Sequence, residues 1–252
     1  IIMKVSVVIP TLNEEKHLPK LLKSIQLQEY EDIEVIVANS PNSTDKTGDI
    51  AKDFGVKLIE GGILSVARNN GAKHSTGDIL FFADADTEFP DKKFLRDCID
   101  LFLKENLDLS STLMIPDEES KRNFTAFTAV HFWCLLKKIS GKLPKPFIES
   151  GGCMVCKKDV FIDVGGFREE LPNGVPEDLD FTLRSIKKGY KYKVIKAKIM
   201  MSGRRFNKPI KAIKRMAAIA TLGNLAMRTD LHKNKTYVKI YQKLYGDLGG
   251  DQ

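Results

Sequence analysis

The N-terminal third of the chain alternates short apolar runs with stretches of helical periodicity, and this alternation restricts the fold more than any other feature. Four runs have the length, β-branched content and flanking breakers of strands: Val5–Ile9, Ile33–Ala38, Val56–Glu60 and Asp78–Ala83. Helices are predicted between them, the first with Pro19 in its opening turns and the others over Thr44–Phe54 and Leu64–Ser75. Strands separated by helices form parallel βαβ units with right-handed crossovers. We therefore expect an α/β fold with a mostly parallel, doubly wound, twisted sheet flanked by helices.

The second half of the chain is less regular. A helix is predicted over Asp91–Glu105, a strand near Leu109–Ile115 and a long amphipathic segment over Glu119–Ile139. A strand at Cys153–Cys156 precedes a short helix and a turn at Gly165–Phe167. Beyond that turn, Pro176 is expected as the first residue of a helix that ends near Gly189.

The strand predicted at Asp78–Ala83 ends in two acids, Asp84 and Asp86. Open α/β sheets bind ligands outside the carboxyl ends of their strands. Carboxylate oxygens at that edge suit Mg²⁺ or Mn²⁺ better than zinc. The alternative is that both acids only cap the following turn. Two acids at this spacing are common by chance, so the neighbouring motifs must decide between a metal site and a cap.

The composition is that of an ordinary globular protein, with 42% hydrophobic and 29% charged residues in a chain of 252. This length allows one large domain, or one domain with an appendage. The longest apolar stretches, Phe124–Leu136 and Met216–Met227, are too short to span a bilayer and fit buried or interfacial helices better. No signal peptide is expected at the N-terminus.

The four cysteines, Cys98, Cys134, Cys153 and Cys156, do not form a disulfide framework in a chain this long, which favours a reducing, cytoplasmic location. Cys153 and Cys156 have the spacing of a metal-binding or redox pair. We prefer two buried core thiols, because no second Cys or His pair accompanies them. A strand would also place residues i and i+3 on opposite faces.

The formal charge of +7 conceals an asymmetry along the chain. Residues 184–252 carry 18 Lys and Arg against 3 Asp and Glu, whereas residues 1–183 carry 22 against 30. A basic segment behind an acidic domain can bind nucleic acid, anionic lipid or a phosphate-bearing substrate, or it can be a solvated face. Nucleic acid is the weakest of these and is not expected as a partner, since no known nucleic-acid motif appears.

Five motifs follow one another over residues 3–205: Val5–Glu15 (VSVVIPTLNEE), Ser65–Gly71 (SVARNNG), Thr76–Asp86 (TGDILFFADAD), Gly165–Phe167 (GGF) and Glu177–Asp178. Their order and spacing resemble the successive signatures of family 2 glycosyltransferases. The resemblance implies a Rossmann-like GT-A fold and a nucleotide-diphospho-sugar donor, such as a UDP- or GDP-sugar. It also implies a divalent cation, Mn²⁺ or Mg²⁺, and transfer of a hexose with inversion at the anomeric carbon.

The same resemblance assigns residues to the donor. The expected nucleotide-sugar contacts are Pro10, Thr11, Asn13, Glu14, Asn39, Arg68, Asp84, Ala85 and Asp86. Asp86 is the expected metal ligand, and Asp84 is expected to hold the ribose or a metal-bound water. Asn39 takes the place of the acid with which the family reads the base; an amide both donates and accepts hydrogen bonds, so the nucleobase stays open. Thr11 and Asn13 could instead cap the next helix, and Arg68 could be a surface arginine.

The acceptor side also follows from the resemblance. Asp178 matches the position of the catalytic base, which an acceptor hydroxyl requires because its own pKa is far above neutrality. Glu177 is expected to support Asp178 or to bind the acceptor. From the residues alone, both acids would only stabilise the N-terminus of the helix that they begin.

Two further pairs are expected to contact the acceptor or a phosphate. Gly151 and Gly152 lack a Cβ and would allow close backbone approach to the substrate. Arg204 and Arg205 stand where many relatives carry a histidine. Guanidinium groups do not ligate cations, but they can hold a departing diphosphate or a phosphorylated acceptor.

We expect a GT-A domain over residues 1–206, with a nucleotide-sugar half at 1–115 and an acceptor half at 116–206, and a basic helical extension at 207–252. The extension fits a helix on an anionic membrane at the cytoplasmic face, a helix packed on the domain, or a helix packed on a second subunit. The expected activity is transfer to a hydroxyl of a glycan or lipid-linked acceptor. The alternatives are transfer to a polyprenyl phosphate and a catalytically inactive nucleotide-sugar binding module.

Overall fold

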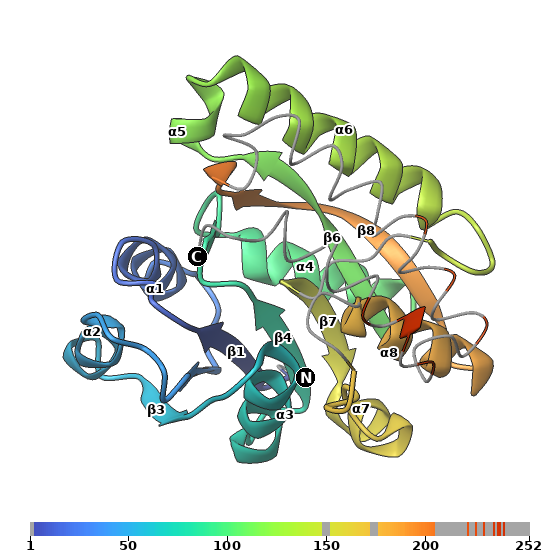
Figure 1. Cartoon of the computed structure of the whole chain (residues 1–252), viewed down its shortest axis with the longest axis horizontal. Helices are drawn as coiled ribbons and strands as arrows, with labels where there is room; N and C mark the ends of the chain where they lie inside the picture. The colour runs from blue at the N-terminus through green and yellow to red at the C-terminus, as the bar shows by residue number, and fades with distance from the viewer. Residues whose placement is uncertain are drawn as a thin grey trace.

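A computed structural model describes residues 3–147, 152–171 and 176–204, together with isolated positions between 221 and 239. Its centre is an eight-stranded sheet in the order β3-β2-β1-β4-β7-β6-β8-β5 (Figure 1). The strands are β1 (Val5–Thr11), β2 (Ile33–Asn39), β3 (Lys57–Glu60), β4 (Ile79–Ala83), β5 (Thr87–Glu88), β6 (Leu109–Pro116), β7 (Cys153–Lys157) and β8 (Tyr192–Met201). Only β7 and β5 run against the others, so the expected mostly parallel sheet is confirmed.

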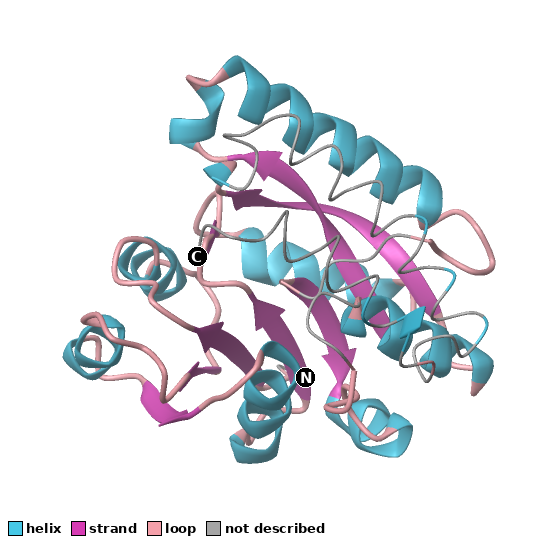
Figure 2. Cartoon of the chain, viewed as in Figure 1, coloured by secondary structure: helices cyan, strands magenta, loops and turns pink. Residues whose placement is uncertain are grey.

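Helices cover both faces of this sheet (Figure 2). They are α1 (Leu18–Gln26), α2 (Thr47–Asp53), α3 (Leu64–His74), α4 (Phe94–Lys104), α5 (Glu118–Lys121), α6 (Phe124–Ser140), α7 (Lys158–Val164) and α8 (Glu177–Lys187). One core lies under α1, α2 and α4, and a second lies under α3, α7 and α8. No helix among the described residues is long and apolar enough to cross a bilayer.

The two cores exist because successive strand residues point to opposite faces. In β4, Phe81 packs in the first core, whereas Phe82 packs in the second. In β7, Cys153 lies in the first core and Cys156 in the second, and all four cysteines are free thiols. The interpretation of this cysteine pair as core residues is therefore confirmed.

Several predicted elements differ from the structure. The helix expected from Asp91 begins at Phe94, and Pro176 is the N-cap of α8 and not its first residue. The helix predicted from Thr44 begins at Thr47, because the Asp45 side chain accepts hydrogen bonds from the main chain and hydroxyl of Thr47 and holds the residues before Thr47 in a turn. The strand predicted to close at Pro10 continues to Thr11, because Pro10 still lies in register with β2. The single segment predicted over Glu119–Ile139 is two helices, since the Asn123 side chain caps the start of α6.

One long strand was not predicted at all. Strand β8 lies beside β6 and contains Lys193, Lys196 and Lys198, which are exposed, and Ile195 and Ile199, which are buried. In the sequence these lysines belong to the basic segment of residues 184–252, which gives no sign of a strand. Residues 184–204 belong instead to α8 and β8 within the domain, and the predicted helical extension at 207–252 lies largely outside the described residues.

Candidate functional site

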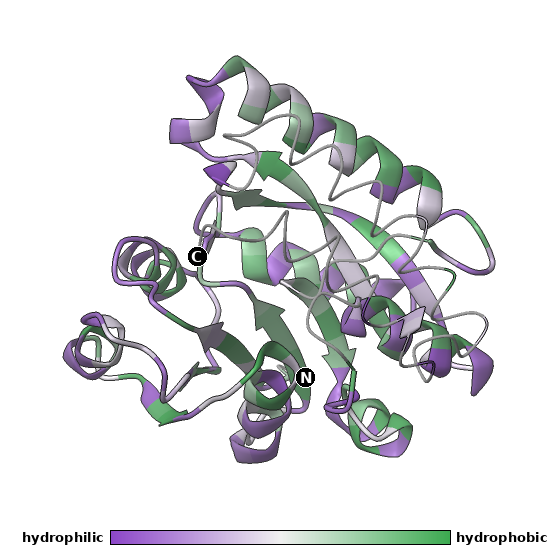
Figure 3. Ribbon diagram, in the orientation of Figure 1, coloured by the Kyte–Doolittle hydropathy of each residue, from purple (hydrophilic) through white to green (hydrophobic). Residues whose placement is uncertain are grey.

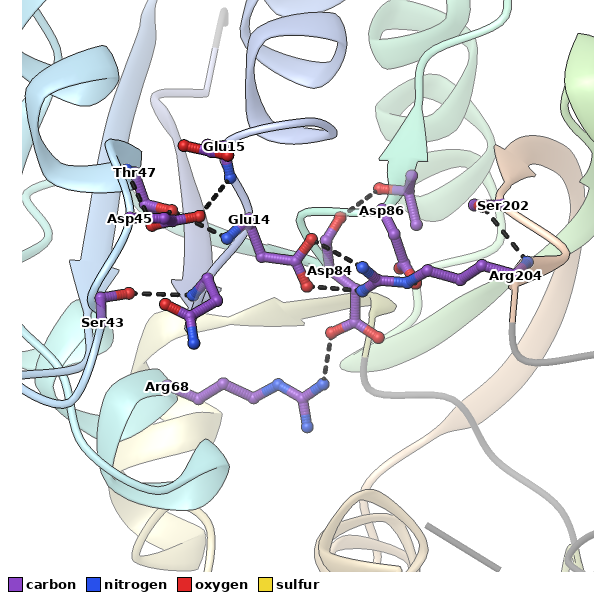
Figure 4. Close-up of polar contacts among 12 residues, drawn as sticks. Glu14, Glu15, Ser43, Asp45, Thr47, Arg68, Asp84, Asp86, Ser202 and Arg204 are labelled. Atoms are coloured by element: carbon purple, nitrogen blue, oxygen red, sulfur yellow. Dashed lines mark hydrogen bonds and ion pairs between the residues drawn. The ribbon is translucent and has the colours of Figure 1, made fainter. Parts of the chain in front are cut away.

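The predicted site residues gather at one edge of the sheet, where β1, β2 and β4 end (Figure 4). Strand β8 ends at the same edge, because it runs parallel to β6, and it delivers Arg204 there. Strand β7 runs the other way and therefore begins at this edge, so Cys153 pairs with Ala83. Segments that are distant along the chain thus meet around Asp84 and Asp86.

The loop after β1 is fastened to the loop after β2. The Asn13 main chain, at a φ of 54°, donates to the Ser43 hydroxyl (2.9 Å), and the Asn13 side chain accepts from the Thr44 main chain (2.8 Å). The main chain of Glu14 donates to the Thr47 hydroxyl (2.8 Å). Asn13 thus connects the two loops by hydrogen bonds. Glu14 is held with its carboxylate directed into the site (Figure 4).

Asp45 is a second residue that connects these loops by hydrogen bonds. It accepts from the main chains of Glu15 and Thr47 and from the Thr47 hydroxyl. Burial raises the pKa of the Asp45 carboxyl, but these hydrogen bonds outweigh burial and hold the pKa below its usual value. Asp45 therefore stays ionised at neutral pH and keeps the two loops together.

Thr11 and Asn39 lie side by side at the ends of β1 and β2. The Thr11 hydroxyl donates to the Asn39 side-chain oxygen at 2.9 Å. This contact occupies the accepting end of the amide and leaves its NH₂ group as the end that can meet a ligand. A Cβ at Gly48 would lie 3.3 Å from that nitrogen, so α2 packs closely against the amide.

Arg68 is the buried centre of the site and not a surface arginine. It is 1% exposed, and its guanidinium donates to Asp84 (2.8 Å) and to Glu177. The ring of Phe167 lies 5.5 Å from the guanidinium carbon. Arg68 therefore joins the acid that ends β4 to the acid that begins α8.

Two adjacent acids begin α8. Burial, and next the neighbouring charge of Asp178, raise the pKa of the Glu177 carboxyl from 4.5 to about 7, although Arg68 acts against them. The main chain of Leu179 approaches the Asp178 carboxylate at 2.7 Å. Burial lowers the pKa of Arg68, but the charges of Asp84, Glu177 and Asp178 outweigh burial and raise that pKa. Glu177 and Asp178 thus lie within electrostatic reach of Arg68 and Asp84, as the predicted single site requires.

Asp86 has a separate cationic partner. Arg204 contacts the Asp86 carboxylate through Nε (3.1 Å) and pairs with both oxygens of Glu14 (Figure 4). The main-chain oxygen of Asp86 accepts from Ser202 (2.9 Å). Burial and the Arg204 charge lower the pKa of His17, which lies nearby. Arg204 therefore lies between two of the acids expected to serve the nucleotide-sugar.

The remaining predicted residues have simpler positions. Ala85 is 3% exposed and packs in the first core, so only its main chain can serve a ligand. Pro10 is a buried residue of β1. A Cβ at Gly152 would lie 2.2 Å from the Asp84 carboxyl, so this glycine is required by the acid beside it. Gly151 and Arg205 lie outside the described residues.

Sequence reasoning missed several supporting residues. Asn69 exchanges hydrogen bonds with the main chain of Phe167 and so fixes the Gly165–Phe167 turn against α3. Its position inside the Ser65–Gly71 motif was the available signal. Asp45 and Thr47 lie in a turn rich in Ser, Thr and Asp, which is the usual composition of capping segments.

The acids fit a divalent cation of the Mg²⁺ or Mn²⁺ type. Asp84 and Asp86 offer hard carboxylate oxygens, and Asp86 is only 7% exposed. Among the described residues, no three His, Cys, Asp or Glu side chains are placed to hold a metal together.

Fold and site together define an α/β protein with acids at the carboxyl edge of its sheet. Residues 6–165 match the family described as Glycosyl transferase family 2, and the chain belongs to that family. It has the GT-A fold. It aligns with a mannosyltransferase of Pyrobaculum calidifontis, solved with GDP-Man and Mn²⁺, at a TM-score of 0.69 and 19% identity, over 98% of this chain and 73% of the other.

Two curated relatives match over shorter segments. A 4,4'-diaponeurosporenoate glycosyltransferase of Staphylococcus haemolyticus is 36% identical over 110 residues, which are 40% of this chain and 29% of that protein. A GalNAc(5)-diNAcBac-PP-undecaprenol beta-1,3-glucosyltransferase of Campylobacter jejuni is 33% identical over 94 residues, 34% of this chain and 30% of that protein. The aligned segments thus span less than a third of each of these relatives.

Proposed function

We propose that this chain is an inverting glycosyltransferase that moves a hexose from a nucleotide-diphospho-sugar to an acceptor hydroxyl with the help of a divalent cation. The observation that carries the proposal is the buried Arg68, which joins Asp84 to Glu177. Arg68 brings the acids that end β4 and the acids that begin α8 into one site. A single displacement needs such a site, because the donor and the attacking hydroxyl must meet there.

On the donor side, Asp86 would hold the cation, and Asp84 would hold the ribose or a cation-bound water. The cation would neutralise the charge that develops on the departing diphosphate. Arg204, which lies 3.1 Å from Asp86, would meet the same diphosphate. Asn39 would present its NH₂ group to an acceptor atom of the base, since Thr11 occupies its oxygen. This arrangement leaves both uridine and guanosine donors open, because both bases carry carbonyl oxygens.

On the acceptor side, Asp178 would take the proton of the attacking hydroxyl. The bond from the acceptor oxygen to the anomeric carbon forms while the bond to the diphosphate breaks, and the diphosphate leaves with the electron pair. Glu177, whose raised pKa keeps part of it protonated near neutrality, would support Asp178 without adding a second full negative charge. Residues 1–115 would supply most of the donor site and residues 116–206 most of the acceptor site.

The test uses Asp178→Asn with Asp159→Asn as its matched control. Asp159 and Asp178 both lie in the first turn of a helix, and each carboxylate is approached by the next main-chain NH at 2.7 Å. Release of nucleoside diphosphate from UDP- and GDP-sugars is measured with and without Mn²⁺, in the presence of lipid-linked and soluble sugar acceptors. We expect release to fall by about 100-fold or more in the Asp178 variant, the usual effect of losing a general base, and to stay unchanged in the control.

Other outcomes favour the alternatives. Unchanged transfer by Asp178→Asn would overturn the base and favour an acceptor that is already ionised, such as a polyprenyl phosphate. Absence of release from every donor, together with metal-dependent binding of nucleoside diphosphates, would favour an inactive binding module.

A further inference from the structure

Helix α6 presents its apolar residues to the outside of the molecule. Phe124 is 82% exposed, Phe132 56%, Leu135 52% and Ile139 46%. The face turned to the protein is smaller and more polar, and it buries Ala126, Val130, Lys137 and Ser140. Soluble surface helices have the opposite arrangement, with the apolar stripe toward the core. The exposed residues Phe124, Phe132, Leu135 and Ile139 form the α6 apolar face.

The inward face of α6 packs closely against the domain, so the outward orientation of the apolar residues does not come from poor packing of the helix. A Cβ at Gly141 would lie 2.2 Å from the Val194 side chain of β8, and a Cβ at Gly203 would lie 2.6 Å from Ala126. Helix α6 forms one edge of the molecule over β6 and β8 (Figure 1), and hydrophobic residues recur along its length (Figure 3). The helix therefore holds its apolar face outward on a rigid base.

The charged residues of α6 and of the segment after it are all basic. Residues 120–147 contain no Asp or Glu. Their exposed basic residues are Lys121, which pairs with Glu118, and Arg122, Lys138, Lys142 and Lys145, whereas Lys137 is buried on the inward face. Lys138 and Lys142 are exposed and lie one turn apart at the C-terminal end of the helix. A large apolar patch with basic residues beside it is typical of a helix that lies in the interface of an anionic membrane.

We propose that the α6 apolar face binds an anionic lipid surface, with α6 lying in the plane of the headgroups. Phenylalanine and leucine side chains would enter the acyl boundary, and Lys138 and Lys142 would meet the lipid phosphates. The N-terminal end of α6 contacts Gly203, next to Arg204, so binding would hold the candidate site close to the lipid surface.

A second copy of the chain fits this face less well. Symmetric pairing would bring the exposed Lys138 and Lys142 of both copies to one interface. Residues 120–147 offer no acid with which they could pair; Glu118 and Glu119 precede the helix, and Glu118 already pairs with Lys121. An anionic lipid surface covers the same apolar area and also pairs with the lysines.

The test measures binding of the chain to vesicles by flotation, using phosphatidylcholine with about 30% phosphatidylglycerol and phosphatidylcholine alone. The variant is Phe132→Gln, Leu135→Gln and Ile139→Gln together. The matched control is Leu27→Gln with Ile162→Gln, which removes apolar residues of similar exposure, 63% at the end of α1 and 66% in α7. We expect binding that needs phosphatidylglycerol, falls at least 10-fold in the α6 variant and is unchanged in the control.

A second variant, Lys138→Gln with Lys142→Gln, should weaken binding to the anionic vesicles and reduce its dependence on salt. Full vesicle binding by the α6 variant would overturn the proposal, because it would place binding elsewhere in the chain. Equal binding to both vesicle types would overturn the role of charge. A dimer in sedimentation analysis that the α6 variant dissociates, without vesicle binding, would show a self-association face instead. Release of nucleoside diphosphate in solution should be the same in the α6 variant, which separates this proposal from the proposed activity.

Discussion

Arg204 supplies the positive charge next to Asp86 and Glu14. Its guanidinium pairs with Asp86 and Glu14, so a cation that binds Asp86 must share or displace it. We predict that Arg204→Gln increases the rise in melting temperature that Mn²⁺ alone produces, because the acids lose a competing cation. The measurement is a thermal shift against Mn²⁺ concentration without nucleotide.

The control for Arg204 is Arg168→Gln. The two arginine side chains are similarly exposed, 34% and 32%, and each pairs with a buried acid, but Arg168 pairs with Asp180 away from the donor acids. The control should leave the Mn²⁺ response unchanged. An equal or smaller Mn²⁺ response in the Arg204 variant would show that this arginine does not compete for the cation.

Glu177 gives the site a dependence on pH. Its carboxyl pKa is raised from 4.5 to about 7, so the folded state favours the neutral acid. The stability that comes from the neutral acid is fully present below pH 4.5 and is lost as the pH rises through about 7. We predict that Glu177→Gln removes this loss, which corresponds to about 3 kcal/mol over the window.

The measurement for Glu177 is urea unfolding of both proteins from about pH 4.5 to about pH 8. The free energy of unfolding of the wild type should fall relative to that of the variant as the pH rises. Parallel curves for the two proteins would contradict the raised pKa.

At the scale of elements, the contact between α3 and β1 decides where Arg68 lies. A Cβ at Gly71 would be 2.2 Å from Cγ1 of Val8, so α3 can approach the sheet only with glycine here. We predict that Gly71→Ala destabilises the protein by about 1–3 kcal/mol, the usual effect of overpacking. It should also weaken nucleotide binding, because the helix that carries Arg68 is pushed outward.

Val8→Ala supplies the control for this prediction. Val8→Ala opens the space that the new methyl group needs. The free energy of unfolding of the double variant should therefore exceed the additive expectation from the two single variants by about 1 kcal/mol. Chemical denaturation of the four proteins measures the coupling. Additive effects would mean that α3 does not press on Val8.

The elements themselves were predictable where their pattern is local. Strands β1, β2 and β4 are short, apolar and closed by turn residues, and helices α1 and α4 repeat apolar residues at helical spacing. Strand β8 was missed because its lysines mask the alternation, and its pairing partner β6 is distant in the sequence. A strand with one solvated face is recognised mainly by its neighbour.

At the scale of the whole molecule, the two cores protect the thiols. Cys98, Cys153 and Cys156 are 0% exposed, whereas Cys134 on α6 is half-buried. Burial raises the pKa of the Cys98 and Cys156 thiols, which suppresses the reactive thiolate. We predict that a thiol reagent labels Cys134 first in the native protein and the other three at the rate of unfolding.

Peptide mass mapping of each labelled cysteine, with and without denaturant, checks this order. Rapid labelling of Cys153 or Cys156 in the native protein would show that β7 opens locally, independently of the two cores.

The sequence by itself determined the succession of strands and helices from β1 to β4, the parallel direction of these four strands and the family. These features depend on periodicity, breakers and motif order, all of which are local to a few residues. It also placed acids at the end of β4 and at the start of α8.

Only the tertiary structure decided what these charged groups contact. Arg68 and Glu177 are 109 positions apart, and Arg204 and Glu14 are 190 apart. Such pairs depend on the order of strands in the sheet and on the reversal of β7, which no local pattern encodes. The same holds for the outward apolar face of α6, because helical spacing shows that one face is apolar but only packing shows which way that face turns.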